Sequence, residues 1–127
     1  MTRQFSDLPD AELTVLQALW DHWGPATIRQ LTDAIYPSGT DAHYSTVQKL
    51  LDRLETKGFV KRNRDSWAHT FEAVLQRNEL IGHRLEAMAE KLCNGSLTPL
   101  LTNLVQSKRL SARERREIRK LMEELDS

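Results

Sequence analysis

The clearest structural pattern of this chain lies in residues 43–64, HYSTVQKLLDRLETKGFVKRNR. Its first half predicts a helix, because four apolar residues recur at the spacing of one buried helical stripe: Val47, Leu50, Leu51 and Leu54. Gly58 suits the end of this helix, since glycine tolerates the left-handed conformation of a helix C-terminus. Residues 59–62 then alternate like a half-buried strand, and a second strand-like run at 67–71 follows turn residues at 63–66. The segment therefore predicts a helix followed by a two-stranded hairpin.

Two further helices are expected before this segment. The first covers about residues 9–23, with an apolar stripe of Leu13, Leu16, Trp20 and Trp23. We expect both tryptophans to lie in the core, with partial exposure of Trp23 near the helix end as the alternative. Thr27 is expected to cap a short second helix that closes at residues 36–39, and a small strand at 25–26 would pair with the hairpin. Three helices followed by a hairpin is the order of a winged helix-turn-helix domain, in which the hairpin is the wing.

From residue 75 onwards the pattern is purely helical. The first of three expected helices stops at Asn94-Gly95, Ser96 caps the second, and a capping box at 111–114 starts the third. Helices of this size expose too much apolar surface to stand alone in water, so we expect them to form a dimer interface. Its predicted residues are Ile81, Leu85, Met88, Leu92, Leu97, Leu100, Leu101, Leu104, Ile118, Leu121, Met122 and Leu125. We predict a mainly α fold with a small β-wing: a winged-helix domain at residues 1–74 and a three-helix dimerisation region at 75–127.

Positive charge is concentrated around the third helix and the wing. The whole chain carries 18 Lys or Arg and 18 Asp or Glu, but residues 43–64 hold six basic residues against two acidic ones. Screening over about 8 Å at physiological salt lets this local excess attract phosphates. We therefore predict that the segment binds double-stranded DNA. The predicted contacts are Tyr44, Ser45, Thr46, Gln48 and Lys49 on the helix, of which all but Tyr44 approach bases, and Arg53, Lys61, Arg62 and Arg64 at phosphates. Trp67 is expected to pack the wing against the body, with a position along the DNA backbone as the alternative.

Motifs for catalysis or metal binding are missing from the sequence. The four histidines are scattered, and neither a Gly-rich phosphate loop nor a nucleophile elbow occurs. Cys93 is the single cysteine, which excludes an intrachain disulfide, and it is interpreted as a small buried apolar residue. We expect no enzymatic activity, no cofactor and no metal. No apolar run approaches the ~20 residues of a membrane span, and residues 1–10 lack a secretory signal, so no membrane insertion and a cytoplasmic location are expected.

Three segments carry a family resemblance: LPDAELTVLQALW at 8–20, YSTVQKLLDRLETKGFV at 44–60 and GSLTPLLTNLVQSKRLSARERREIRKLMEEL at 95–125. In order, spacing and length they resemble the penicillinase-repressor (BlaI/MecI-type) family of bacterial transcriptional regulators. The resemblance implies a homodimeric repressor that binds a pseudo-palindromic operator, at promoters of β-lactamase or related genes. It also implies release when a membrane-bound sensor protease triggers cleavage in the dimerisation region. The family's cleavage position aligns with Asn103-Leu104.

Two departures from the family pattern bear on function. The family's wing usually has a Gly-Arg pair at its turn, whereas this chain has Ser66-Trp67. The basic wing contact is then expected to move to Arg62 or Arg64. The copper-responsive branch carries a cysteine cluster near its C-terminus, and this chain ends in EELDS. Copper sensing through that cluster is excluded.

Two other functions fit parts of the sequence. A winged-helix protein-interaction module would use the surface around Lys49 and Arg62 to meet an acidic partner, without binding DNA. A redox or metal sensor would be built on Cys93. The salt dependence of binding to a duplex distinguishes the first alternative, because a protein-interaction module would ignore DNA.

Overall fold

The computed structural model describes residues 8–126, which form six helices and a three-stranded sheet. In chain order the elements are α1 (Asp10–Asp21), β1 (Ala26–Thr27), α2 (Ile28–Ile35), α3 (Asp41–Thr56), β2 (Val60–Asn63), β3 (Thr70–Ala73), α4 (Arg77–Cys93), α5 (Thr98–Gln106) and α6 (Ala112–Asp126). The chain divides into two compact units, one ending at His83 and the other beginning at Arg84. None of the helices in the described part has the length and hydropathy of a membrane span.

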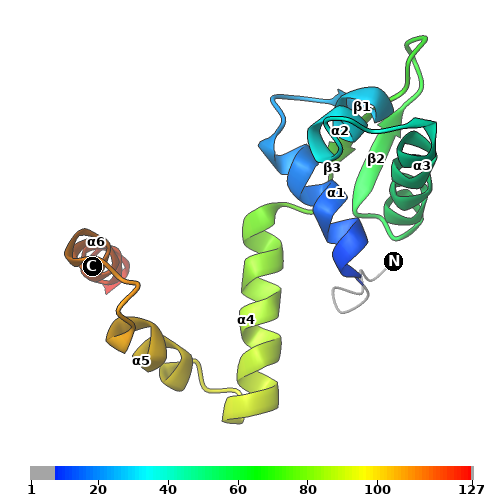
Figure 1. Cartoon of the computed structure of the whole chain (residues 1–127). Helices are drawn as coiled ribbons and strands as arrows, with labels where there is room; N and C mark the ends of the chain where they lie inside the picture. Colours follow the sequence, from blue (N-terminus) through cyan, green and yellow to red (C-terminus); the bar gives the residue numbers. More distant parts are fainter. Residues whose placement is uncertain (1–7, 127) are drawn as a thin grey trace. The chain divides into compact units, whose positions relative to one another are not determined.

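The first unit is a winged helix (Figure 1). Its sheet is antiparallel in the order β1-β3-β2, so β3 is central, and Phe71 of β3 lies between Ala26 and Arg62. Helices α1, α2 and α3 pack on one another and on this sheet. The core is apolar and fully enclosed, with Leu16, Leu31, Val47, Leu51, Leu54, Phe59 and Phe71 at its centre. The predicted fold class and the small strand paired with the wing are therefore confirmed.

The junction between α3 and the wing forms as the sequence predicts. Gly58 has a φ of +81°, and the Phe59 N–H donates across the turn to the Leu54 carbonyl at 2.9 Å. This geometry ends the helix and directs the chain into β2. At the other end of α3, Nδ1 of His43 accepts a 3.0 Å hydrogen bond from the Thr40 N–H. Local hydrogen bonds thus define both ends of α3.

Two expectations for α1 have different outcomes. Trp20 is half-buried, and its Nε1 donates to the Leu75 carbonyl at 2.9 Å. Trp23 is 98% exposed, so its predicted place in the core is wrong. The helix ends at Asp21 and the chain turns extended at His22, which takes Trp23 off the apolar stripe.

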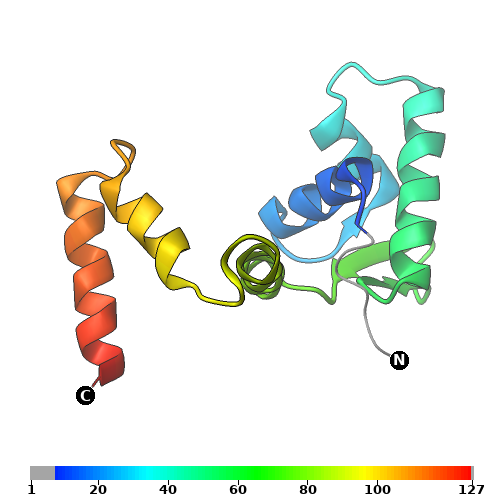
Figure 2. The ribbon, with the colours of Figure 1, turned by 90° about the horizontal axis from the view of Figure 1, so that it is seen from below.

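The second unit contains most of α4 together with α5 and α6. Asn94 and Gly95 both have positive φ and end α4, as predicted. Ser111 and Glu114 form the predicted capping box of α6, with both hydrogen bonds at 3.1 Å. The expectation for Ser96 needs correction, because Leu97 holds the N-cap position and the Ser96 hydroxyl accepts from the Thr98 N–H at 3.3 Å. Figure 2 shows α5 and α6 as a helical hairpin.

Candidate nucleic-acid and dimer interfaces

Helix α3 presents a polar face to solvent. Ser45, Thr46, Gln48 and Lys49 are exposed, whereas Val47 and Leu51 between and below them are fully buried. The Thr46 hydroxyl donates to the Ala42 carbonyl at 3.0 Å, which leaves its oxygen lone pairs to accept. The face therefore offers an amide, an ammonium group and two hydroxyls from one rigid helix, the groups that read base edges in a major groove.

A groove of about 480 Å³ connects this face to α2, β2 and the wing loop. It is lined by Thr27, Ile28 and Arg29 at the start of α2, Tyr44 and Gln48 of α3, Arg62 of β2, and Trp67, Ala68 and His69 of the wing loop. The N-terminus of α2 borders this groove, and the positive end of its helix dipole favours phosphate there. One concave surface thus combines α3, the N-terminus of α2 and the wing.

Arg29 is a candidate contact that the sequence reasoning missed. Its guanidinium lies 4.8 Å from the centre of the half-buried Tyr44 ring. Arg29 follows the Thr27 cap of α2 by two residues. A basic residue in the first turn of the helix before α3 is the sequence feature that could have identified this contact. Arg29 and Tyr44 together border the groove beside α3.

The cations of the wing are held in ion pairs within the domain. Lys61 Nζ lies 3.7 Å from Glu72, and Arg64 lies 3.4 Å from Glu55. Arg62 is the most enclosed: its side chain is 14% exposed, it pairs with Asp52 and Glu55 of α3, and its guanidinium stacks 4.7 Å from the Phe71 ring centre. Arg62 Nε is buried without a hydrogen bond, with the Glu55 carboxylate at 3.7 Å. Arg62 therefore ties the wing to α3.

Free positive charge lies on α3 rather than on the wing. Lys57, at the end of α3, pairs with the buried carboxylate of Glu12 at 2.5 Å. Lys49 and Arg53 form no ion pair with any other residue of 8–126, and both are exposed. Ion pairs within the fold thus neutralise most of the local excess of positive charge counted in the sequence. The charge that remains, on Lys49 and Arg53, lies on α3.

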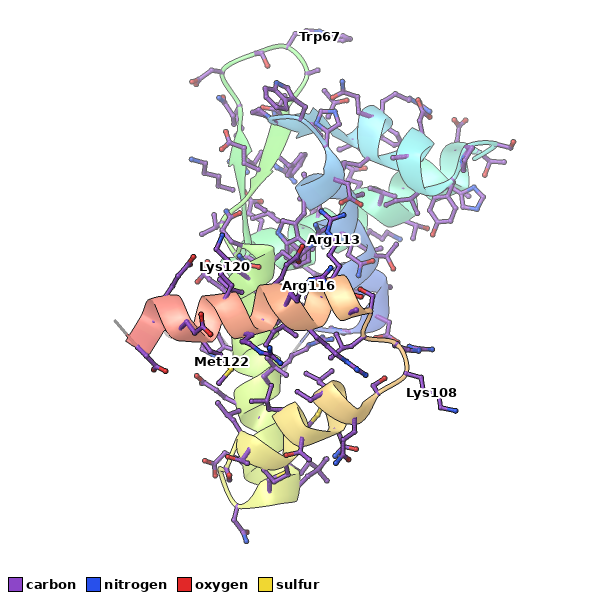
Figure 3. The ribbon with its side chains drawn as sticks, turned by 90° about the vertical axis from the view of Figure 1, so that its left-hand side faces the viewer. Trp67, Lys108, Arg113, Arg116, Lys120 and Met122 are labelled. Carbon is purple, nitrogen blue, oxygen red and sulfur yellow. The ribbon has the colours of Figure 1, made fainter. Side chains whose placement is uncertain are left out.

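The tip of the wing carries Trp67, which is 100% exposed. The prediction that Trp67 packs the wing against the body is wrong. Strand pairing ends at Asn63 and Thr70, and the loop between them extends past the helices. Figure 3 shows Trp67 at the end of this loop, pointing away from the domain.

The predicted dimer residues lie on exposed helix faces of the chain. Leu100 and Ile118 are half-buried, and the others are between 38% and 84% exposed: Ile81, Leu85, Met88, Leu92, Leu97, Leu101, Leu104, Leu121, Met122 and Leu125. A groove of about 340 Å³ between α5 and α6 is bordered by Val105, Leu110, Ile118 and Met122. Along α6, Arg113, Arg116 and Lys120 lie on the side opposite Met122 (Figure 3). These apolar faces are left exposed by the residues that the structure describes.

The predicted cleavage position lies in the middle of α5. Asn103 is exposed, and its side-chain amide donates to the Pro99 carbonyl one turn earlier at 3.0 Å. Leu104 is 52% exposed. Cys93 is half-buried at the end of α4, and no group of three or more His, Cys, Asp or Glu in residues 8–126 could hold a metal ion.

Comparisons with known proteins agree with this architecture. The family model of the penicillinase repressor matches residues 8–124. The transcriptional regulator BlaI of Mycobacterium tuberculosis is 34% identical over 121 residues, which cover 94% of this chain and 86% of that protein. The penicillinase repressor of Bacillus licheniformis is 22% identical, with 96% of this chain and 94% of that protein covered.

The family match extends through both units, from the first residue of the described core to the last turns of α6. Its members are transcriptional regulators and not enzymes, which agrees with the expectation from the sequence. With a winged helix followed by three apolar-faced helices, and a family model that spans nearly its whole length, this chain belongs to the penicillinase repressor family.

Proposed function

We propose that this protein is a homodimeric repressor that binds a pseudo-palindromic DNA operator. The observation that carries the proposal is the groove shared by α2, α3 and the wing, whose exposed side chains are those that bind bases and phosphates. The elements before residue 75 would bind DNA, and those after it would form the dimer.

Base reading falls to the exposed face of α3. Gln48 can pair with both the N6 and N7 positions of adenine, and Lys49 can donate to guanine O6 or N7. The Ser45 hydroxyl can donate to a phosphate or pair with a base, and the Thr46 oxygen can accept from a base amino group. Lys49 and Arg53 attract the duplex with charge that no described acidic group neutralises.

Phosphate contacts from the wing require an exchange of partners. Lys61 and Arg64 have side chains 68% and 58% exposed, so a phosphate can replace their carboxylates at little cost. Arg62 is too enclosed for that exchange, and we assign it to positioning the wing. Tyr44 and Arg29 complete the phosphate-binding side at the start of α2 and α3.

Dimerisation is supported by the apolar faces of α4, α5 and α6. Eleven large apolar residues of these described helices and the turns that join them are at least 38% exposed, all between Ile81 and Leu125. Exposed apolar side chains in this number mark a protein interface in a chain that must remain dispersed in water. A second copy offers the same apolar faces, and a twofold arrangement would then match a pseudo-palindromic site.

Release by proteolysis is the finer part of the proposal. Cleavage between Asn103 and Leu104 would divide α5 and separate α6 from the rest of the interface. Each winged helix would then keep only its own DNA contacts and lose the effective concentration that pairing supplies. A membrane-bound sensor protease is the activator that the family resemblance implies.

Selection of duplexes from a random DNA pool by the full-length protein tests the proposal. We expect a palindromic sequence to be enriched, with an affinity whose logarithm falls linearly with the logarithm of salt concentration. A lack of enrichment, together with no binding to any duplex at low salt, would contradict DNA binding and favour a protein-interaction module.

Cleavage is tested separately in the full chain by replacing residues 102–105 with the recognition sequence of a site-specific protease. Cutting should release the selected duplex, whereas the same protease should leave the unmodified protein bound. Retention of DNA after complete cutting would contradict the release mechanism without affecting the operator assignment.

A further inference from the structure

The wing of this protein ends in an aromatic side chain and not in a free cation. Trp67 is 100% exposed at the tip of the β2–β3 loop (Figure 3). An indole costs free energy when it is fully hydrated, and nothing in the described chain covers it. Its exposure is therefore not explained by folding.

The loop presents Trp67 in a defined direction. The Asn63 side-chain oxygen accepts from the Asp65 N–H at 2.8 Å, and the Ser66 hydroxyl donates to the Ala68 carbonyl at 2.7 Å. These local bonds on both sides of the tip order the loop. Trp67 also borders the groove that Gln48 and Tyr44 of α3 line, which places this residue next to the polar face of α3.

The cations of the wing lie in or beside the strands, so charge does not account for a contact at its tip. Arg62 is enclosed between α3 and Phe71, while Lys61 and Arg64 are paired with Glu72 and Glu55. Asp65 adds a negative charge beside the tip. Among the described residues of the wing, the largest exposed side chain available for a contact is therefore the apolar ring of Trp67.

We propose that Trp67 is an apolar minor-groove contact that reads the base pairs flanking the site of α3. The inference rests on the proposed DNA-binding function. With α3 in the major groove, the neighbouring surface of the duplex is the backbone and the adjacent minor groove, where an extension beside a recognition helix can reach. Apolar side chains inserted there partly unstack base steps and favour deformable sequences.

Minor-groove insertion predicts a definite sequence preference. The guanine 2-amino group projects from the floor of the minor groove, whereas A·T pairs carry only acceptors there. Trp67 should therefore favour A·T pairs in the flanks and disfavour G·C pairs. Inosine lacks the 2-amino group but keeps the major-groove edge of guanine, so it separates the two grooves chemically.

The first test compares Trp67→Ala with Trp23→Ala in the full-length protein, using the duplex selected from the random pool. Trp23 is a matched control, since it is 98% exposed and does not border the groove. We expect W67A to weaken binding by about 10-fold or more, with Trp67→Phe retaining most of the affinity, and W23A to change nothing. The salt slope of W67A should equal that of the wild type, because the substitution removes no charged group. Equal affinities for W67A, W23A and the wild type would overturn the inference.

The second test varies only the flanks of the selected duplex, with A·T, G·C or inosine·cytosine pairs. The wild-type protein should bind the A·T and inosine duplexes alike and the G·C duplex more weakly, and W67A should bind all three equally. A preference that follows the major-groove edge instead would overturn the minor-groove assignment. Failure of the wild-type protein to bind any duplex would contradict the proposed function itself, which separates the two failures.

Discussion

The winged-helix unit and the C-terminal helices have the same helical spacing of apolar residues, but these residues are buried in the first and exposed in the second. In α3, Val47, Leu51 and Leu54 are fully buried, whereas Leu121 and Leu125 of α6 are 57% and 84% exposed. An amphipathic helix is stabilised mainly by the surface that covers its apolar face. The first unit supplies that surface from α1, α2 and the sheet, and the second does not supply it within one chain. We infer that the first unit folds by itself, whereas the second needs a partner.

The largest effect is expected in the core of the first unit. Phe59 is fully buried, and its carbonyl accepts from the N–H groups of Val74 and Leu75. Phe59→Ala should lower the free energy of unfolding by about 3–5 kcal/mol, through reduced burial and a residual cavity. Denaturant unfolding followed by circular dichroism measures it. Trp23→Ala is the exposed control, and an equal loss for both variants would contradict the core assignment.

Charge placed on the apolar face of α6 should separate the dimer. Met122 is 50% exposed beside the α5–α6 groove, and Lys120 lies on the opposite side of the helix (Figure 3). Met122→Glu should shift sedimentation toward the monomer and weaken operator binding about 100-fold, because avidity disappears with the dimer. Lys120→Glu reverses a charge on the same helix and should leave the dimer intact. Equal behaviour of the two variants would remove the apolar face from the interface.

The two classes of ion pair in the first unit should differ in strength. Glu12 is 2% exposed and pairs with Lys57, whereas Glu72 pairs with Lys61 at a largely solvated site. Glu12→Ala should lower the free energy of unfolding by about 1–3 kcal/mol, because it removes the buried carboxylate that the partly buried Lys57 ammonium contacts. Glu72→Ala should cost less than about 1 kcal/mol. Thermal or denaturant unfolding of both variants provides the comparison, and a larger loss for Glu72→Ala would reverse the ranking.

The smallest effect concerns the free charge of α3. Lys49→Gln should reduce the slope of log affinity against log salt by about 1, because one cation fewer displaces counterions from the duplex. Lys91→Gln, at an exposed position of α4, is the control and should leave the slope unchanged. Fluorescence anisotropy with the selected duplex at several salt concentrations measures both. An unchanged slope for Lys49→Gln would remove Lys49 from the charged surface that binds DNA.

Local features of the fold could be predicted from the sequence, because their causes lie within a few residues. The stop at Gly58, the Asn94-Gly95 break and the capping box at Ser111 depend on backbone conformation and short-range hydrogen bonds. The apolar stripe of α3 followed from helical spacing alone. The order of the two regions followed from the change to a purely helical pattern at residue 75.

Long-range pairings could not be predicted in the same way. Glu12 occupies a buried position of α1 only because Lys57, 45 residues later, reaches it. Arg62 is withdrawn from the surface by Asp52 and Glu55, whose approach depends on the angle between α3 and β2. Trp23 was assigned to the core by its place on the apolar stripe, but the helix ends at Asp21 before reaching it. Trp67 was assigned to packing, but it lies exposed at the tip of the loop.

Native mass spectrometry of the complex formed with the selected duplex would count the chains that bind together. Two copies of the chain on one palindromic duplex, with Met122→Glu giving one copy at much lower affinity, is the predicted result. One wild-type copy on the duplex, bound as tightly as before when half of the palindrome is scrambled, would contradict the claim that a second chain covers the apolar helices.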